Sequence, residues 1–401
     1  MEKQTTYAGS GVNINLGNDV SKILYNAAKQ TWVNRKGKLG EVIVPFDDFS
    51  GVRAIDVSNL PSGTLMNLGF DGVGTKIELG ERVKNHKTIA YDLFAMVCDD
   101  AVVRGAEPVL IGSILDVNSL GTSDKPFIEE VRQLAEGYIN AAKAANVAIV
   151  NGEVAELGAR VRGYSKLPRL CTRLRQAWHY LVGGELPKQS GFSYNWGAGV
   201  VWFAKKDRMF TGKEIKEKDY LVGLREEGFR SNGLSLFRKI MKNNYGDNWH
   251  QVTWKKKDVN LADLALTPSK IYTATVVDMF GGYCGEPKTE VHGAAHITGG
   301  GIPGKLGRVL KPSGLGAIID NPFQPSEFVR YVQQLGNVSD TEAYKTWNMG
   351  QGMIIITPKP NEVIKIAGEH EIEAKTIGRV TREQGIKITP LEKLKSLIFE
   401  N

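Results

Sequence analysis

The sequence has few of the features that mark secreted, zinc-binding or membrane-spanning proteins. Its 401 residues include only three cysteines, Cys98, Cys171 and Cys284, which lie far apart and lack the close spacing of zinc ligands. Their scarcity argues against a disulfide framework and favours a reducing, cytoplasmic setting. No apolar run approaches the roughly 20 residues that a membrane-spanning helix needs. The opening MEKQTTYAGSGVNINLGN also lacks the apolar stretch of a secretory signal. We therefore expect no membrane association.

The excess of positive charge is confined to one segment. The formal net charge is +7, but seven basic residues and one acidic residue lie between Ala159 and Ser193, so this segment alone carries +6. The rest of the chain is nearly neutral, which makes the basic character a local feature. Within the segment, LPRLCTRLRQAWHYLV has apolar residues at helical spacing. We hypothesise an amphipathic helix that closes over an anionic ligand, and a charged surface loop is the commoner alternative.

The order of expected elements predicts an α/β (α+β) fold with two domains. Residues 64–204 read as strand, helix, strand, helix, strand and strand, which is typical of a domain built on one sheet. A second alternation begins near Asp219, and the polar stretch Lys206–Lys218 separates the two. The length also favours two domains. We assign residues 1–206 to the first, with a basic insertion at 159–193, and residues 207–401 to the second.

A glycine-rich loop, GFDGVGTK, follows the first strand. Gly72 and Gly74 would let backbone N–H groups approach an anion, while Thr75 and Lys76 add a hydroxyl and a positive charge that could meet a phosphate. The pattern matches neither the Walker loop nor the dinucleotide fingerprint. A tight turn without ligand is therefore an equally good interpretation.

Two adjacent carboxylates, Asp99 and Asp100, come at the end of a mostly apolar helix. They repel each other and lie where the helix dipole favours cations, so a bound divalent cation would compensate them. Together with Asp71 they could form the oxygen-rich set that holds magnesium beside nucleotide phosphates. The alternative is a solvated helix face, which is also what we expect of Asp92 one or two turns earlier.

The segment VHGAAHITGGGIPGKLGRVL joins an expected strand to an expected helix through Thr298, Gly299, Gly300 and Gly301. Exposed N–H groups at a helix start bind phosphate, and glycines allow a ligand to come close. His296 on the strand could transfer protons, although a lone histidine is more often structural.

The segment REEGFRSNG lies between another strand and helix. Ser231 and Asn232 there could contact a ligand or simply cap the helix.

Taken together, these segments resemble the aminoimidazole ribonucleotide synthetase family, also called phosphoribosylformylglycinamidine cyclo-ligases. The resemblance follows the family's order over nearly the whole chain apart from the basic insertion. The matching stretches are YAGSGVNINLGN, GFDGVGTK, CDDAVVRGAEP, NGEVAE, FRSNGLSLFRKI, LTPSKIY, VHGAAHITGGG and YKTWNMGQGM.

The resemblance implies a homodimer whose N-terminal sheets join into a barrel. It implies ATP bound along that sheet, with phosphates near the 71–76 loop and further contacts at Gly152 and Glu153. Magnesium would be held by Asp71, Asp99 and Asp100. The substrate, a small nucleotide, would place its ribose phosphate toward residues 298–301 and contact Ser231 and Asn232. Catalytic roles would fall to Asp71, Lys76, Asp100 and His296.

The implied reaction converts formylglycinamidine ribonucleotide and ATP into aminoimidazole ribonucleotide, ADP and phosphate in purine biosynthesis. Such chemistry depends on positioning and charge neutralisation more than on a protein nucleophile.

Three positions depart from the family's pattern. Many relatives have histidine where this chain has Arg230, and asparagine where it has Asp99. A lysine in the relatives' first helix aligns with Tyr25. These departures affect the details of substrate binding more than the use of ATP.

Two alternative functions are compatible with the sequence. The chain could be another ATP-using member of the same superfamily. It could also be a catalytically degenerate member that binds nucleic acid through the basic insertion, where Trp178 and Tyr180 could stack on bases. Because a charged surface loop explains that segment more simply, we do not expect nucleic acid as a partner.

Overall fold

The computed structural model describes residues 14–44, 53–163, 191–254, 258–390 and 396–400. Two sheets organise these residues, and no strand is shared between them. The first sheet has its strands between Thr64 and Lys205, and the second has its strands between Tyr220 and Phe399. The limits proposed for the two domains remain a prediction, but the change from one sheet to the other falls in the expected stretch.

The N-terminal sheet has four strands in the order β3-β8-β4-β7. Its pairs are antiparallel except β4 with β7, which are parallel. The strands are β3 (Thr64–Gly72), β4 (Ala106–Val117), β7 (Ala148–Glu156) and β8 (Tyr194–Lys205). Two short ribbons accompany them, β1 (Val42–Ile43) with β2 (Ala54–Ile55), and β5 (Gly121–Thr122) with β6 (Lys125–Pro126). The strand and helix order expected over residues 64–204 is confirmed.

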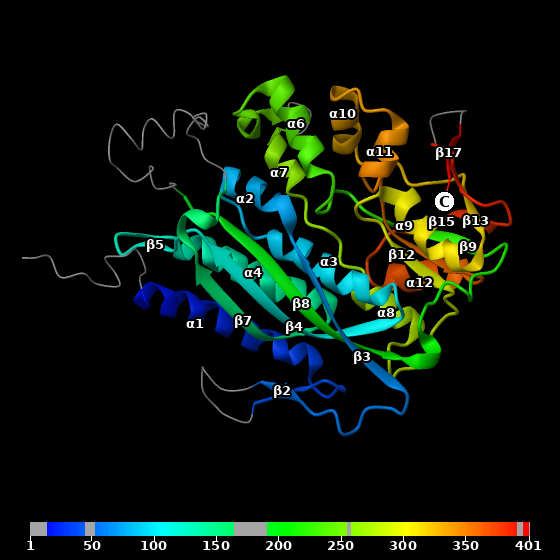
Figure 1. Ribbon diagram of the computed structural model, residues 1–401, viewed down its shortest axis with the longest axis horizontal. Helices are drawn as coiled ribbons and strands as arrows, with labels where there is room; N and C mark the ends of the chain where they lie inside the picture. The colour runs from blue at the N-terminus through cyan, green and yellow to red at the C-terminus, as the bar shows by residue number, and fades with distance from the viewer. Residues whose placement is uncertain (1–13, 45–52, 164–190, 255–257, 391–395, 401) are drawn as a thin grey trace, which may run out of the picture.

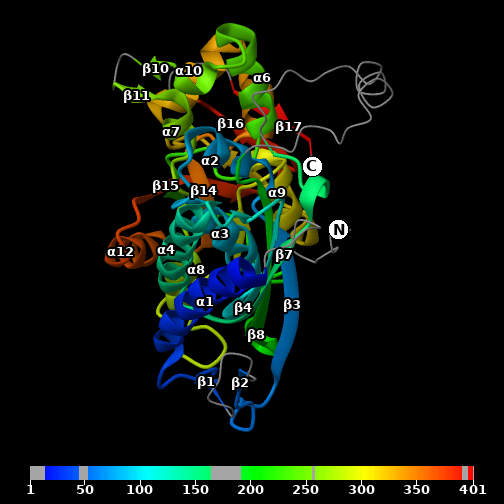
Figure 2. The same ribbon diagram turned by 90° about the vertical axis from the view of Figure 1, so that its left-hand side faces the viewer.

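Helices cover one face of this sheet (Figures 1 and 2). The helices of this half are α1 (Ile14–Thr31), α2 (Ile77–Val83), α3 (Ile89–Val102) and α4 (Ile128–Ala145). Helix α3 packs on β3, β4 and β8, and α4 packs on α1 and α3. Along α4, Val131, Leu134 and Tyr138 are buried, as their helical spacing predicts.

The opposite face of the N-terminal sheet carries exposed apolar side chains. Met66, Leu68 and Phe70 alternate along β3, and Ile114 of β4 shares their face because both Ile114 and Gly72 pair with Gly197. Their exposed fractions are 64%, 47%, 75% and 57% in that order. An edge strand with this much exposed apolar surface is unusual for a monomer.

The C-terminal sheet has seven strands in the order β12-β14-β9-β15-β13-β16-β17, and only β13 and β16 are parallel. The strands are β9 (Tyr220–Arg225), β12 (Gly293–His296), β13 (Gly316–Ile319), β14 (Gln351–Thr357), β15 (Ala374–Thr381), β16 (Ile386–Ile388) and β17 (Leu397–Phe399). A separate ribbon pairs β10 (Thr253–Trp254) with β11 (Val259–Asn260).

Helices pack on both faces of the second sheet. They are α6 (Leu234–Tyr245), α7 (Leu261–Ala265), α8 (Thr273–Phe280), α9 (Gly301–Leu310), α10 (Glu327–Leu335), α11 (Asp340–Thr346) and α12 (Pro360–Glu369). Side chains of α8 and α12 share one apolar cluster with β9 and β14, whereas α9 and α10 join the larger cluster on the other face.

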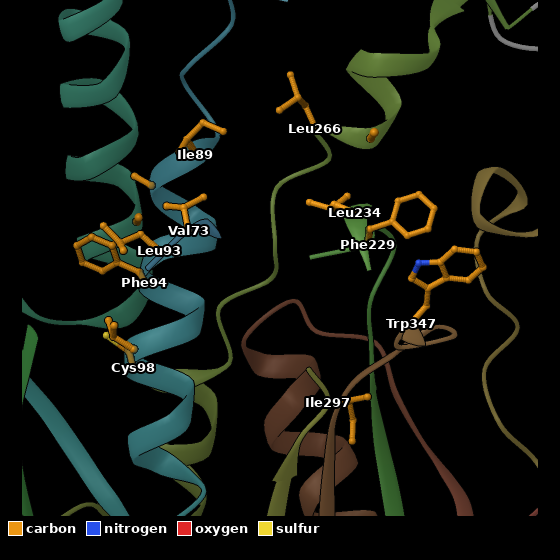
Figure 3. Packing of buried hydrophobic residues seen from close by; sticks show 14 of the residues in the cluster. Val73, Ile89, Leu93, Phe94, Cys98, Phe229, Leu234, Leu266, Ile297 and Trp347 are labelled. Carbon is orange, nitrogen blue, oxygen red and sulfur yellow. The ribbon is translucent and has the colours of Figure 1, made fainter. Parts of the chain in front are cut away.

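That larger cluster runs through both halves of the chain. Figure 3 shows Leu93 and Phe94 of α3 on one side, and Phe229 and Trp347 from the C-terminal half on the other. Helix α8 also packs against α3 and β4. The two sheets are therefore joined by a packed apolar interface.

Most of the basic insertion lies outside the described residues, and so does the amphipathic helix hypothesised within it. Its two flanks lie next to each other: a Cβ atom built on Gly163 would come within 2.2 Å of the Ser193 hydroxyl. Among the described helices, none is long and apolar enough to cross a membrane.

Candidate active site

The predicted site residues meet where α3 faces the loops of the C-terminal half. Asp92 and Asp99 lie two turns apart on α3, and Asp100 follows at its end. The loop between β9 and α6 contributes Arg230, Ser231 and Asn232, and the turn between β12 and α9 contributes residues 298–301. We define this region as the interdomain seam.

Lys76 does not face a phosphate site in this structure. Its side chain is fully buried, and its ammonium lies 2.8 Å from Asp92 and 2.7 Å from the Thr267 carbonyl. The loop turns inward because Gly74–Lys76 forms a 3-10 turn that leads directly into α2. The prediction that Lys76 meets a phosphate is therefore wrong for this conformation.

The helix pattern predicts Asp92 on a solvated face, and this prediction is also wrong. Asp92 is fully buried and also accepts a hydrogen bond from Ser269 at 2.5 Å. Buried charges of opposite sign must pair because an unpaired one is very costly. The Lys76–Asp92 pair thus joins the glycine-rich loop to α3 and to the C-terminal half.

Part of the glycine-rich loop lies at the surface, and its contact with a phosphate stays a prediction. Gly74 has φ +69°, a left-handed conformation that suits glycine, and both Gly74 and Thr75 are exposed. Gly72 ends β3, where an added Cβ would come within 3.2 Å of the Trp196 carbonyl. Backbone of this loop is therefore accessible even though its lysine is not.

Asp99 is directed into the protein and is not available as a metal ligand. One carboxylate oxygen accepts hydrogen bonds from the Tyr272 N–H at 3.0 Å and the Thr273 hydroxyl at 2.9 Å. The other accepts from Arg230 at 3.1 Å. Among the described residues, no group of three or more His, Cys, Asp or Glu side chains is arranged to hold a metal. The three-carboxylate prediction is therefore wrong with respect to Asp99.

Asp71 and Asp100 do share one electrostatic environment at the edge of the seam. Burial raises the pKa of Asp71, and the nearby Asp100 adds to the rise. Burial also acts to raise the pKa of Asp100, but the hydrogen bond from His296 and the cations Lys305 and Arg104 outweigh it and lower the pKa. Two neighbouring carboxyls with oppositely shifted pKa values are typical of functional sites.

His296 connects Asp100 to the buried part of the seam. Its Nδ1 lies 2.6 Å from Asp100 and its Nε2 lies 2.7 Å from an Arg230 nitrogen. Only 3% of His296 is exposed, whereas 53% of the Asp100 side chain is exposed. Asp100 is thus the end of this chain of contacts that solvent or a ligand can reach.

The two predicted substrate segments are brought together. A Cβ built on Gly299 would lie 3.5 Å from the Asn232 side-chain oxygen. Among the described residues, the buried Nδ2 of Asn232 has no hydrogen-bond partner. Neither Ser231 nor Asn232 caps α6, because Gly233 occupies that position with φ +68°. The capping interpretation is therefore wrong.

The glycine turn before α9 combines access with close packing. Gly299 and Gly300 are exposed, and Gly300 has φ +94°. Gly301 is buried, and a Cβ there would lie within 1.9 Å of the Tyr344 carbonyl, so only glycine fits. Thr298 is also buried, and its carbonyl accepts the Gly301 N–H at 2.9 Å.

Gly152 and Glu153 lie away from these groups. Asp71, Ala198, Ser113 and Gly152 form one row across the four strands. At about 4.8 Å a strand, Gly152 is therefore about 14 Å from Asp71. Glu153 is on the exposed apolar face, opposite to α3.

Three residues of the site carried no clear signal in the sequence. Glu226 and Arg230 form a fully buried ion pair at 2.8 Å, but their motif suggested only a cap or a ligand loop. Lys305 of α9 acts electrostatically on both Asp71 and Asp100. A lysine soon after a glycine-rich turn is the one signal that could have identified it.

Models of one protein family match both halves of the chain. Residues 53–170 match the N-terminal domain, and residues 216–390 the C-terminal domain, of AIR synthase related proteins. A phosphoribosylformylglycinamidine cyclo-ligase of Methanococcoides burtonii is 30% identical over 98% of this chain and 99% of its own length. The chain belongs to the AIR synthase related family.

Other relatives support the family and its fold. The cyclo-ligase of Methanocaldococcus jannaschii is 34% identical over 78% of this chain and 77% of its own length. Among solved structures, the hydrogenase maturation protein HypE of E. coli is 13% identical with a TM-score of 0.58, covering 96% of each chain. Thiamine-monophosphate kinase of Stenotrophomonas maltophilia is 12% identical with a TM-score of 0.54, covering 91% of this chain and 95% of its own. These two likenesses concern the two-domain AIR synthase fold alone.

Proposed function

We propose that this member of the AIR synthase related family is an ATP- and magnesium-dependent cyclo-ligase that converts formylglycinamidine ribonucleotide into aminoimidazole ribonucleotide. The observation that carries the proposal is the 30% identity to a protein of that name over 98% of this chain and 99% of the relative. Such end-to-end agreement includes both halves of the interdomain seam.

The chemistry needs a site of this kind. The formyl oxygen of the substrate attacks the terminal phosphorus of ATP, which releases ADP and leaves a phosphate ester on the former amide oxygen. A substrate nitrogen then attacks the formyl carbon, the carbon–oxygen bond breaks, and phosphate leaves as the ring closes with loss of a proton. Because both steps move charge among phosphate oxygens, orientation and charge neutralisation supply most of the rate.

Asp71 and Asp100 fit a magnesium ion better than the three-carboxylate set did. Among the described residues, Asp100 accepts a hydrogen bond on one oxygen alone, from His296 Nδ1 at 2.6 Å. Magnesium typically binds through one or two carboxylates, keeps several waters and contacts the phosphates. When bound, it would neutralise charge on the transferred phosphoryl group. Lys305 adds a positive charge at the same place.

The substrate phosphate is assigned to the turn before α9. Exposed Gly299 and Gly300 permit close approach of an anion, and the start of the ten-residue helix α9 favours negative charge. The unpartnered Nδ2 of Asn232 is a donor next to this turn. Ser231 lies beside it, 3.5 Å from Asp92.

The exposed apolar face of the N-terminal sheet supports a homodimer. Two copies that pair these faces would cover Met66, Leu68, Phe70 and Ile114, which otherwise remain in water. Glu153 is on the same face, so a nucleotide contact there would require the site to extend toward the partner copy.

The direct test is to incubate the purified protein with formylglycinamidine ribonucleotide, ATP and magnesium. We expect stoichiometric ADP and aminoimidazole ribonucleotide, and no product without ATP. ADP release with thiamine monophosphate, but not with formylglycinamidine ribonucleotide, would instead support another member of the superfamily and overturn the proposal.

A further inference from the structure

Arg230 is the centre of a buried chain of contacts that ends at Asp100. The arginine side chain is fully buried although it comes from a loop. One terminal nitrogen donates to Glu226 at 2.8 Å and to the Lys270 carbonyl at 3.0 Å. The other donates to Asp99 at 3.1 Å. The guanidinium therefore lies between two carboxylates, one from each half of the molecule.

The same guanidinium and the Asp100 carboxylate require the same tautomer of His296. The second terminal nitrogen of Arg230 also lies 2.7 Å from His296 Nε2. A guanidinium has donors and no acceptor, so Nε2 must accept and the imidazole proton must be on Nδ1. Nδ1 lies 2.6 Å from Asp100, and His296 therefore donates to that carboxylate.

We propose that Arg230 is a positioning residue for the active site: it holds the His296 ring through Nε2, in the orientation that fixes the Asp100 carboxylate at the mouth of the seam. Asp99 is part of the same group of contacts, because its carboxylate balances the charge of Arg230 and holds the guanidinium against α3. The effect of Arg230 on catalysis rests on the proposed function, in which Asp100 acts on ATP. The effect of Arg230 on the orientation of His296 is independent of the proposed function.

The backbone and the sequence agree with this assignment. Arg230 has φ +56°, a left-handed conformation that is uncommon outside glycine and needs support from its surroundings. Asp99 and Arg230 are also two of the three positions at which this chain departs from the family's pattern. In this chain the two residues form one buried ion pair at 3.1 Å.

The first experiment reads the His296 imidazole directly. The chain has only six histidines, so nitrogen NMR of protein labelled with 15N-histidine can resolve them, and His296→Gln assigns the signal. We expect the Nδ1–H tautomer in the wild type, with Nε2 accepting a hydrogen bond from the guanidinium. In Arg230→Met the Asp100 carboxylate still keeps a proton on Nδ1, so the expected change is a shift of the Nε2 signal through loss of that hydrogen bond. An unchanged Nε2 signal in folded Arg230→Met would overturn the proposal, whether or not the protein is a cyclo-ligase.

The second experiment separates positioning from stability. In Arg230→Met we expect kcat to fall at least tenfold, with less than a threefold change in the KM for ATP. The matched control is Arg35→Met, which removes a buried arginine paired with Glu107 at 2.8 Å, away from the seam. It should lower the melting temperature and leave kcat of the folded enzyme within twofold. Equal losses of kcat in the two variants would show that the role of Arg230 is only structural.

A double variant keeps the test decisive if Arg230→Met does not fold. Asp99→Asn combined with Arg230→Gln removes both charges and leaves an amide N–H that can donate to His296. We expect this pair to restore a hydrogen bond to His296 Nε2, seen in its nitrogen signal, and to be at least threefold more active than Arg230→Gln alone. A double variant that folds but is no more active than Arg230→Gln, with the Nε2 signal of an imidazole nitrogen that accepts no hydrogen bond, would contradict the positioning role.

Discussion

Replacing Lys76 with methionine tests whether this lysine stabilises the fold or binds phosphate. The structure places its ammonium in a fully buried pair with Asp92 at 2.8 Å. Removing one partner of such a pair leaves an uncompensated buried charge, which typically costs about 3–5 kcal/mol. For 401 residues the unfolding entropy is about 0.8 kcal/mol/K, so a cooperative transition should shift by about 4–6 °C.

The assay is denaturant and thermal unfolding of Lys76→Met, followed by kinetics at a temperature where it is folded. Combining Lys76→Met with Asp92→Leu should recover at least half of the lost stability, because two apolar side chains replace the pair. Lys87→Met is the control, since Lys87 and Glu136 form an exposed pair and such pairs contribute about 1 kcal/mol or less. Unchanged stability of Lys76→Met together with a large rise in the KM for ATP would refute the structural reasoning and restore the phosphate role.

Three further outcomes are expected. Asp100→Asn should lower kcat by more than tenfold and weaken the magnesium dependence, because a lost ion contact typically costs a few kcal/mol; a fully active variant would exclude the metal assignment. Phe70→Asp should convert a dimer into a 44 kDa monomer in light scattering, whereas Ile398→Asp, at an equally exposed site on β17, should not. Deletion of residues 164–190 with a short Gly-Ser link should leave the melting temperature within a few degrees, since the flanks already lie side by side; an unfolded product would show that the insertion is needed, and a raised KM for ATP would support its closing over a ligand.

The order of elements could be predicted because each depends on a local pattern. The apolar spacing of Val131, Leu134 and Tyr138 along α4 is periodic over the length of the helix, and these side chains are buried in the structure. The meeting of the 231–232 loop with the 298–301 turn could be anticipated only from the resemblance, because the segments are far apart in sequence.

The direction of charged side chains could not be predicted from the sequence. Lys76 can be buried because its ammonium donates hydrogen bonds to Asp92 and to the carbonyl of Thr267, which lies 191 residues later in the chain. Asp99 can be buried because Arg230, which lies 131 residues later in the chain, donates a hydrogen bond to its carboxylate. A helix pattern shows which face is apolar, but it does not show that a second domain will cover the polar face.

The apolar cluster that spans both halves implies that the two segments matched by sequence comparison fold together as one unit. Sequence comparison divides the chain into two modules, at 53–170 and 216–390. Leu93 and Phe94 nevertheless pack in one core with residues of the second module, such as Ile297 and Trp347. Either module expressed alone would expose its share of that core to water together with one partner of the buried Asp99–Arg230 ion pair. The chain should therefore melt in a single transition, and truncation at the module boundary should yield aggregation and not a smaller working domain.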